Sequence, residues 1–192
     1  YLVEAGLLVP HADGHRVKVF TEVDTALEWT EDLILNEAAL TPSTETALEL
    51  HEMELFRQRN AQTLVALEAC MERRTVQAGG IIFSRGDAGD ELFLIRRGAV
   101  RIVLPVSDTR SHHLGTFGRG SFFGEMSFLD GAARSADAVA FSQTDLYVLS
   151  RKVYNQFAEA HRKTALDLME GIASTLASRL RYTTAELRVL ES

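Results

Sequence analysis

The sequence is poor in cysteine, proline and tryptophan, with one, three and one of these residues among 192. A single cysteine, Cys70, excludes an internal disulfide framework and a zinc site built on several cysteines. Its neighbours Leu64, Leu67 and Met71 predict that the thiol is buried on a helix face and unreactive. This cysteine usage favours a reducing, cytoplasmic compartment.

Long hydrophobic runs are also missing. No apolar stretch approaches the roughly 20 residues of a membrane-spanning helix, and the first residues lack the basic start of a signal peptide. The chain begins without methionine, which predicts that it is part of a longer protein.

A positive charge balance is the next thing that the chain lacks. Its formal net charge is −7, which argues against general nucleic-acid binding. Residues 21–60 contain ten acidic residues against two arginines, so the remainder of the chain is close to neutral. An anion site in that remainder is therefore not opposed by the overall charge.

Catalytic and metal-binding patterns are absent as well. No Ser/His/Asp or Cys/His arrangement indicates nucleophilic catalysis, so the sequence predicts neither an enzyme nor a metal centre. The pair His112–His113 suggests comparison with cupin-type metal barrels. Neighbours on a strand point to opposite faces, however, so we interpret both histidines as exposed loop residues.

The N-terminal third is predicted to be largely helical. Residues 1–40 read as a helix, a short strand and a second helix, which are too few elements for an independent domain. Residues 41–50 form a linker in which Thr41 and Pro42 start a helix that continues to Phe56. Asn60 is expected to cap a further helix that ends at Cys70.

From residue 73 the hydrophobic period changes to that of strands. Short β-prone runs recur about every ten residues and are separated by glycine turns, which predicts a sandwich or barrel. The expected strands are 81–83, 92–95, 100–104, 114–117, 138–141 and 146–149.

The last 40 or so residues are again helical. Ser150 is expected to cap one helix, and a long helix follows almost to the end. Its apolar row has coiled-coil-like spacing and consists of Met169, Ile172, Leu176, Leu180, Thr183, Leu187 and Leu190. This row can pack on the β region, pair with a second copy, or do both in different halves.

The segment 123–134 carries the most specific chemistry. Gly124 lets the backbone approach an anion, and a short helix that begins there directs N–H groups towards it. Arg134 can bind phosphate oxygens in a forked geometry. Glu125 would repel a phosphate, so a sugar hydroxyl is its natural partner.

Over residues 50–190 the chain resembles the cyclic nucleotide-binding domain. The matching motifs are 78–83, 86–95, 98–102, 120–125 and 134–136, in the order and spacing of that family. The resemblance implies an α+β fold, a β-roll of the double-stranded β-helix or jelly-roll kind flanked by helices, with a long C-terminal helix. It also implies that Arg134 binds the cyclic phosphate of cAMP or cGMP and that Glu125 accepts the ribose 2′-hydroxyl. The implied ligand-binding residues are Phe123, Gly124, Glu125, Met126, Arg134, Ser135 and Ala136.

Two positions depart from the family pattern. The family often has proline before the arginine, where this chain has Ala133, and the loss loosens the turn. A hydroxyl residue after the arginine, here Ser135, often accompanies cGMP preference in the family, although serine is also common in bacterial domains assigned to cAMP. We expect cAMP rather than cGMP.

Residues 1–40 carry a second resemblance, on the segment 19–32. It is similar to the C-terminal end of a STAS domain, as joined to a cyclic nucleotide-binding domain in bacterial SulP-type anion transporters. We therefore expect a regulatory module that controls a transporter of this type. Some bacterial glutaminases carry a similar tail, so the regulatory tail of a glutaminase is the alternative. The resemblance implies a cytoplasmic module that meets a membrane only through its parent protein, with residues 1–40 as a short α/β remnant of the STAS domain and residues 51–192 as the nucleotide-binding domain.

These features can be weighed against three possible functions. The first is a cyclic nucleotide sensor in which the C-terminal helix acts as a lid that hinges around residues 150–165. The second is a module of the same fold with an empty pocket that forms oligomers, such as a homodimer, through that helix. The third, a DNA-binding activator, is disfavoured because no helix-turn-helix follows the long helix and the chain is acidic.

Overall fold

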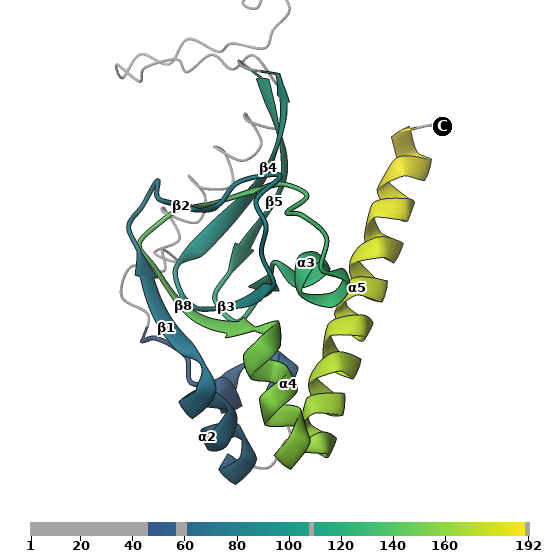
Figure 1. Ribbon diagram of the computed structural model, residues 1–192. Coiled ribbons are helices and arrows are strands. Elements are labelled where there is room, and N and C mark those ends of the chain that lie inside the picture. The colour runs from purple at the N-terminus through teal and green to yellow at the C-terminus, as the bar shows by residue number, and fades with distance from the viewer. Residues whose placement is uncertain (1–45, 57–60, 108–109, 191–192) are drawn as a thin grey trace, which may run out of the picture. The chain divides into compact units, whose positions relative to one another are not determined.

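The computed structural model describes residues 46–56, 61–107 and 110–190, all of which belong to the unit Pro42–Ser192. Strands occupy the middle of this unit, and two helices form its C-terminal part (Figure 1). The predictions for residues 1–45, including the STAS-like segment and the helix start at Thr41, lie outside the described residues, as does the cap at Asn60. Within the described ranges, no helix combines the length and the apolar character that crossing a membrane requires.

The described strands form two four-stranded antiparallel sheets, in the orders β1-β8-β3-β6 and β2-β7-β4-β5. Sheet neighbours such as β1 and β8 come from opposite ends of the β region. This pattern is that of a β-roll and confirms the expected fold class. The strands are β1 Glu72–Val76, β2 Ile81–Phe83, β3 Glu91–Arg97, β4 Ala99–Ser107, β5 Arg110–Gly118, β6 Phe122–Phe123, β7 Asp137–Ala140 and β8 Thr144–Ser150.

Two apolar cores hold the domain together, one on each face of β3. Phe93 and Ile95 lie in the core between the sheets, where the Phe93 and Phe123 rings stack with centroids 5.0 Å apart. Leu92 and Leu94 point the other way, into the core that the helices share. Because β3 is buried on both faces, its sequence is a continuous apolar run rather than an alternating one.

Helices cover the first sheet and flank the roll. They are η2 Leu50–Glu52, η3 Glu54–Phe56, α2 Ala61–Cys70, α3 Glu125–Asp130, α4 Arg151–Ala160 and α5 Arg162–Leu190. The Ser150 hydroxyl accepts the Val153 N–H at 3.3 Å, which confirms the predicted cap. The chain bends at His161 between α4 and α5, and α5 then runs past α3 (Figure 1).

The prediction of a continuous helix up to Phe56 is wrong over the described residues. Residues 46–49 are not helical, and two short 3-10 helices follow. The backbone N–H of Leu48 donates to the Arg96 carbonyl at 2.9 Å, and Arg96 Nε donates back to the Leu48 carbonyl at 3.1 Å. These tertiary bonds replace the local bonds of a helix, so packing against β3 overrides the helical pattern.

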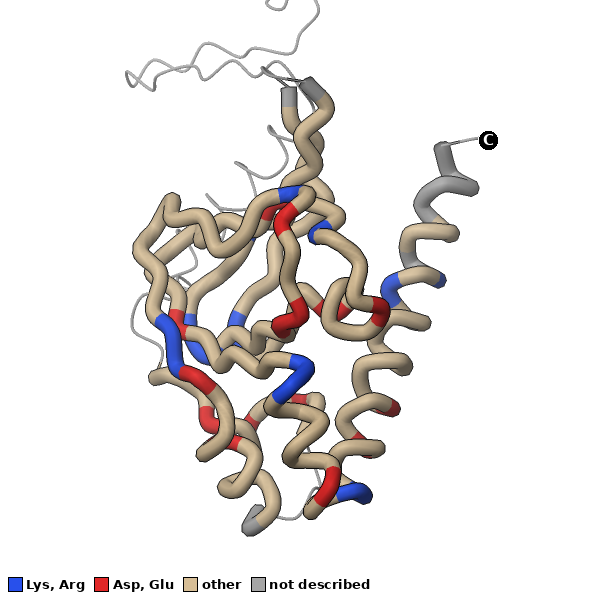
Figure 2. Tube along the Cα trace, in the orientation of Figure 1, with Lys and Arg blue, Asp and Glu red and all other residues tan. Residues whose placement is uncertain are grey.

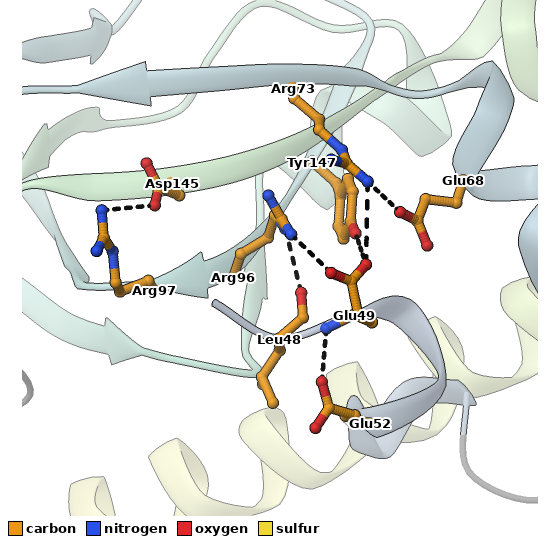
Figure 3. Close-up of polar contacts among 9 residues, drawn as sticks. All are labelled: Leu48, Glu49, Glu52, Glu68, Arg73, Arg96, Arg97, Asp145 and Tyr147. Carbon is orange, nitrogen blue, oxygen red and sulfur yellow. Dashed lines mark hydrogen bonds and ion pairs between the residues drawn. The ribbon is translucent and has the colours of Figure 1, made fainter. Parts of the chain in front are cut away.

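Glu49 fixes the segment 46–49 to the sheet (Figure 3). Its carboxylate accepts the Tyr147 hydroxyl at 2.8 Å and pairs with Arg96 at 3.2 Å. Glu49 and Glu52 also form a capping box around η2. One carboxylate therefore connects the start of the described domain with strands β3 and β8.

Cys70 is exposed, so the prediction of a buried thiol is wrong. The buried positions near it are Leu64, Leu67 and Met71. Cys70 is the last residue of α2 and lies about 120° around the helix axis from Leu64, which takes its side chain off the inward stripe.

The expected strands are all present, but two further strands were not predicted. Strand β1 has the sequence Glu-Arg-Arg-Thr-Val and is largely exposed, so only its pairing with β8 identifies it. Strand β6 has two residues and pairs with β3. Both lie at sheet edges, where burial imposes no alternating pattern.

Candidate functional site

The candidate site is centred on the turn between β6 and β7. Gly124 ends β6 with φ +77°, and Gly131 ends α3 with φ +73°. Both values lie in the left-handed region that favours glycine. The two glycines therefore bracket α3, and the chain brings Arg134 back to the carbonyls of Glu91 and Gly124.

Arg134 is buried, with 3% of its surface exposed. Its Nη1 donates to the backbone carbonyls of Glu91 at 3.0 Å and of Gly124 at 3.1 Å. The guanidinium carbon lies 4.3 Å from the centre of the Phe83 ring, which provides a cation–π contact. Arg134 is thus held by carbonyls and by a ring, and one carboxylate oxygen, Glu91 Oε2, lies 3.7 Å from its Nη2.

One N–H of this guanidinium lacks an acceptor. Arg134 Nε is buried and has no hydrogen-bond partner. An unsatisfied buried donor of a charged group is costly, since its desolvation is not compensated. The arrangement can accept an anion at Nε without the loss of a protein hydrogen bond.

Glycine provides the space beside the arginine. A Cβ on Gly89 would lie 2.7 Å from Arg134 Nε and Nη2, and a Cβ on Gly124 would lie 2.9 Å from Nη1. Contacts this short exclude a larger residue at either position unless the guanidinium moves. Gly89 was not among the predicted site residues, although it lies within a motif that the sequence singled out.

The loop between β2 and β3 fixes the backbone of the arginine. The Gly86 N–H donates to the Arg134 carbonyl at 2.8 Å, and the Arg134 N–H donates to the Asp87 carbonyl at 2.9 Å. The Asp87 carboxylate accepts the Ser84 N–H at 2.8 Å and so stabilises the loop itself. The loop and the β6–β7 turn therefore form one hydrogen-bonded unit.

Burial lowers the pKa of the Arg134 guanidinium, while nearby carboxylates act in the opposite direction. Those carboxylates are, in order of effect, Glu91, Asp90, Asp87 and Glu125. The guanidinium remains protonated at neutral pH, because the pKa of arginine lies far above it. The site therefore presents a permanent buried cation.

Glu125 forms an ion pair with helix α5. Arg179 Nη1 lies 3.2 Å from Glu125 Oε1, and Arg179 Nη2 donates to the Phe122 carbonyl at 2.8 Å. The Arg179 guanidinium also lies over the Phe117 and Phe122 rings. The C-terminal helix is therefore joined to the candidate site through one arginine.

Arg179 was missed by reasoning from the sequence. Its position one turn after the half-buried Leu176 is the available signal that it faces inward. It also borders a cavity of about 490 Å³ between η3, the β5–β6 turn and α5. The cavity lining includes Glu54, Ser121 and Thr175 but none of the predicted site residues.

The remaining predicted residues take different positions. The Phe123 ring is buried in the core between the sheets, so only its backbone can face a ligand. Met126 is exposed, and its sulfur accepts the hydroxyl of the exposed Ser135 at 3.6 Å. Ala136 is buried just before β7.

Charges of both signs are distributed over the sheets and helices of the described domain (Figure 2).

Over the described ranges, no group of three or more His, Cys, Asp or Glu residues could hold a metal ion. His112 lies in β5 and is exposed, and His113 Nε2 lies 3.0 Å from the Thr116 hydroxyl. The histidine pair is thus on a strand rather than in a loop.

Comparisons with known proteins agree with this geometry. A family model described as "Cyclic nucleotide-binding domain" matches residues 73–161. The cyclic AMP receptor protein of Thermus thermophilus is 38% identical over 119 residues, which cover 62% of this chain and 53% of that protein. The crystal structure of the Thermus thermophilus catabolite activator protein aligns with a TM-score of 0.63 and 33% identity, over 71% of this chain and 62% of that one.

A longer match is to glutaminase 1 of Bradyrhizobium diazoefficiens. It is 34% identical over 181 residues, which are 94% of this chain but 29% of the glutaminase. Because 94% of the chain is matched, the similarity extends beyond the β-roll into residues 1–45. The chain spans less than a third of this relative's length.

The described residues form a β-roll domain with a buried arginine at the segment between β6 and β7. Residues 73–161 match the cyclic nucleotide-binding domain family, and the fold is similar to that of the Thermus thermophilus activator.

Proposed function

We propose that this chain is a cyclic nucleotide-binding regulatory module in which Arg134 binds the cyclic phosphate. The observation that supports this most directly is the buried Arg134 Nε, which has no acceptor and faces the space left by Gly89. Glu125 accepts the ribose 2′-hydroxyl, while the backbone around Phe123, Gly124 and Met126 and that of Ser135 and Ala136 completes the site. The family fold supports these roles.

We infer that cAMP is the ligand in preference to cGMP. A relative with 38% identity is named a cyclic AMP receptor protein, which favours cAMP. The Ser135 hydroxyl is exposed, so it is open to an additional contact with either nucleotide. Competition between the two nucleotides in one titration series decides between them.

Helix α5 is proposed to report ligand occupancy. Arg179 holds Glu125 in the structure, and the ribose hydroxyl would approach the same carboxylate. A ligand therefore changes the free energy of the Glu125–Arg179 contact and shifts α5, with the bend at His161 as the hinge. The hinge falls within the predicted range 150–165.

The module is proposed to regulate a larger parent protein, and a glutaminase is the favoured parent. The glutaminase match includes the region before the β-roll and not the domain alone. A SulP-type anion transporter with a STAS domain is the other context, which rests on the resemblance of residues 19–32. The sequence upstream of Tyr1 decides between them, since a transporter requires membrane-spanning segments there.

Isothermal titration of the chain with cAMP and cGMP tests the proposed function. We expect binding of cAMP, and we expect Arg134→Ala to weaken it about tenfold to over a hundredfold, because a charge-assisted contact is lost. Glu125→Ala should also weaken binding. Arg97→Ala is the matched control, since Arg97 pairs with Asp145 at the other end of β3. A folded parent chain that gives no heat with either nucleotide would contradict the proposal.

Self-association through α5 is a second candidate function. Leu166 and Leu180 are 66% and 69% exposed, although both are large apolar residues on the same helix. They are two heptads apart, with the exposed Ala173 between them, as in one row of a coiled coil. A second copy of the chain is the occupant that this spacing favours.

A further inference from the structure

Glu91 lies between two arginines, one of which is the phosphate-site candidate. Its Oε1 accepts a hydrogen bond from Arg74 Nη2 at 3.3 Å, and its Oε2 lies 3.7 Å from Arg134 Nη2. The guanidinium carbons of Arg74 and Arg134 lie 5.8 and 5.4 Å from the centre of the Phe93 ring. One carboxylate and one ring are therefore shared by two guanidinium groups.

The sheet positions Arg74 and Glu91. Arg74 comes from β1 and Glu91 from the start of β3, and both strands pair with β8. Arg74 also binds Glu72 at 2.9 Å, on the edge strand. A continuous row of charges, Glu72, Arg74, Glu91 and Arg134, thus leads from the edge of the sheet to the candidate site.

An anion that binds Arg134 meets the Glu91 carboxylate on the same guanidinium. Like charges this close disfavour each other, so Glu91 opposes the ligand. Asp87, Asp90 and Glu125 also raise the pKa of Arg134, but Glu91 has the strongest effect of the four, and its carboxylate lies 3.7 Å from Arg134 Nη2. Arg74 already contacts Glu91 and can neutralise it without moving it into water.

We propose that Glu91 is an internal counter-ion of Arg134 that sets the affinity of the site, and that Arg74 retains Glu91 when a phosphate takes its place. This proposal rests on the proposed function, because it assigns the anion as the phosphate of a cyclic nucleotide. Glu91 and Arg74 are positioning residues in this scheme, since both act through Arg134. Glu91 still holds Arg134 Nη1 through its backbone carbonyl, which a side-chain substitution leaves in place.

A double-mutant cycle measured by isothermal titration with cAMP tests the proposal. Glu91→Gln should bind cAMP about three- to tenfold more tightly, because a competing charge is removed. Arg74→Gln should bind more weakly by a similar factor, since Glu91 then pairs with Arg134 alone. The double variant should bind like Glu91→Gln, because Arg74 has no carboxylate left to retain.

Glu72→Gln is the control, because it removes the same charge from the other side of Arg74. Its affinity for cAMP should stay within about twofold of the parent's.

Weaker binding by Glu91→Gln, with an unchanged melting temperature, would show that Glu91 positions Arg134 for the ligand and would overturn the proposal. A further loss on adding Arg74→Gln to Glu91→Gln would place Arg74 on the ligand and overturn its assigned role. A parent chain that binds neither nucleotide overturns the proposed function and this inference together, whereas a binding parent with an unchanged Glu91→Gln affinity overturns this inference alone.

Discussion

At the scale of single residues, polar side chains connect segments that the sequence separates widely. Glu49 and Tyr147 are 98 positions apart and share a hydrogen bond of 2.8 Å. This bond, followed by smaller effects that include the Arg96 and Arg73 charges, lowers the pKa of Glu49 against the effect of burial. Burial raises the pKa of Tyr147, and the hydrogen bond to Glu49 acts in the same direction. The folded protein therefore favours a charged Glu49 and a neutral Tyr147.

This pair predicts a stability that depends on pH. A carboxyl group with a lowered pKa in the folded state stabilises it above its unfolded pKa, and the contribution is lost as the pH falls through the folded value. Tyr147→Phe should lower the free energy of unfolding by about 1 kcal/mol at neutral pH, through loss of one hydrogen bond. The difference from the parent should shrink on acidification from about pH 7 to pH 3, as Glu49 is protonated.

Urea denaturation of the two proteins across that range provides the measurement. In a Glu49→Gln background, the effect of Tyr147→Phe on the free energy of unfolding should depend little on pH, because the amide does not titrate. Parallel profiles for the parent and Tyr147→Phe down to the acid end would contradict the assignment of the effect to Glu49.

At the scale of elements, tight turns decide how the strands of the roll connect. Gly98 joins β3 to β4 with φ +86°, and a Cβ there would lie 2.4 Å from the Gln143 carbonyl and 2.7 Å from the Thr144 hydroxyl. Thr144 is buried and donates to the Ala99 carbonyl at 3.0 Å. The β3–β4 turn therefore packs directly on the start of β8.

Gly98→Ala should destabilise the domain by about 2 kcal/mol or more, because the left-handed backbone and the close contact act together. Gly115→Ala, in β5, is the matched control, since its Cβ would meet nothing within 4 Å. Its stability should change by less than about 1 kcal/mol. Thermal denaturation of both variants makes the comparison, and an equal effect of the two substitutions would show that the turn is not tightly packed.

At the scale of the whole molecule, α5 presents one buried face and one exposed face that carries apolar residues. Ala165, Leu168 and Ile172 are buried in the helix-side core, while Leu166 and Leu180 remain exposed. One face of α5 thus packs on the domain, and another carries exposed apolar side chains. Arg179 lies near the boundary and joins the helix to Glu125.

Leu180→Lys should convert a dimer of this chain into a monomer, because it places a charge in the exposed apolar row of α5. Multi-angle light scattering of the purified chain measures the mass. Ser178→Lys adds the same charge at an exposed position outside the row and should leave the mass unchanged. A parent chain that is monomeric at high concentration would contradict pairing through α5.

Much of the fold follows from local patterns in the sequence. Apolar runs such as Leu92–Ile95 indicate strands because burial on both faces requires continuous hydrophobicity, and Ser150 indicates a helix start because its hydroxyl satisfies a free N–H. Predictions failed where tertiary contacts compete with local ones. The residues around Leu48 bond to Arg96 instead of forming a helix, and the polar strand β1 is defined only by β8.

The sequence by itself determined the elements of the candidate site, because Gly124, Glu125 and Arg134 lie within one short segment whose turns need glycine. Strand period and turn spacing, which are local properties, predicted a sandwich or barrel, and the resemblance to the cyclic nucleotide-binding domain implied the β-roll. Only the tertiary structure decided what surrounds Arg134 and Glu125. Arg179 reaches Glu125 from 54 residues further along the chain, and Glu91 meets Arg134 across 43 positions. Those contacts depend on how sheets and helices pack, which no local pattern specifies.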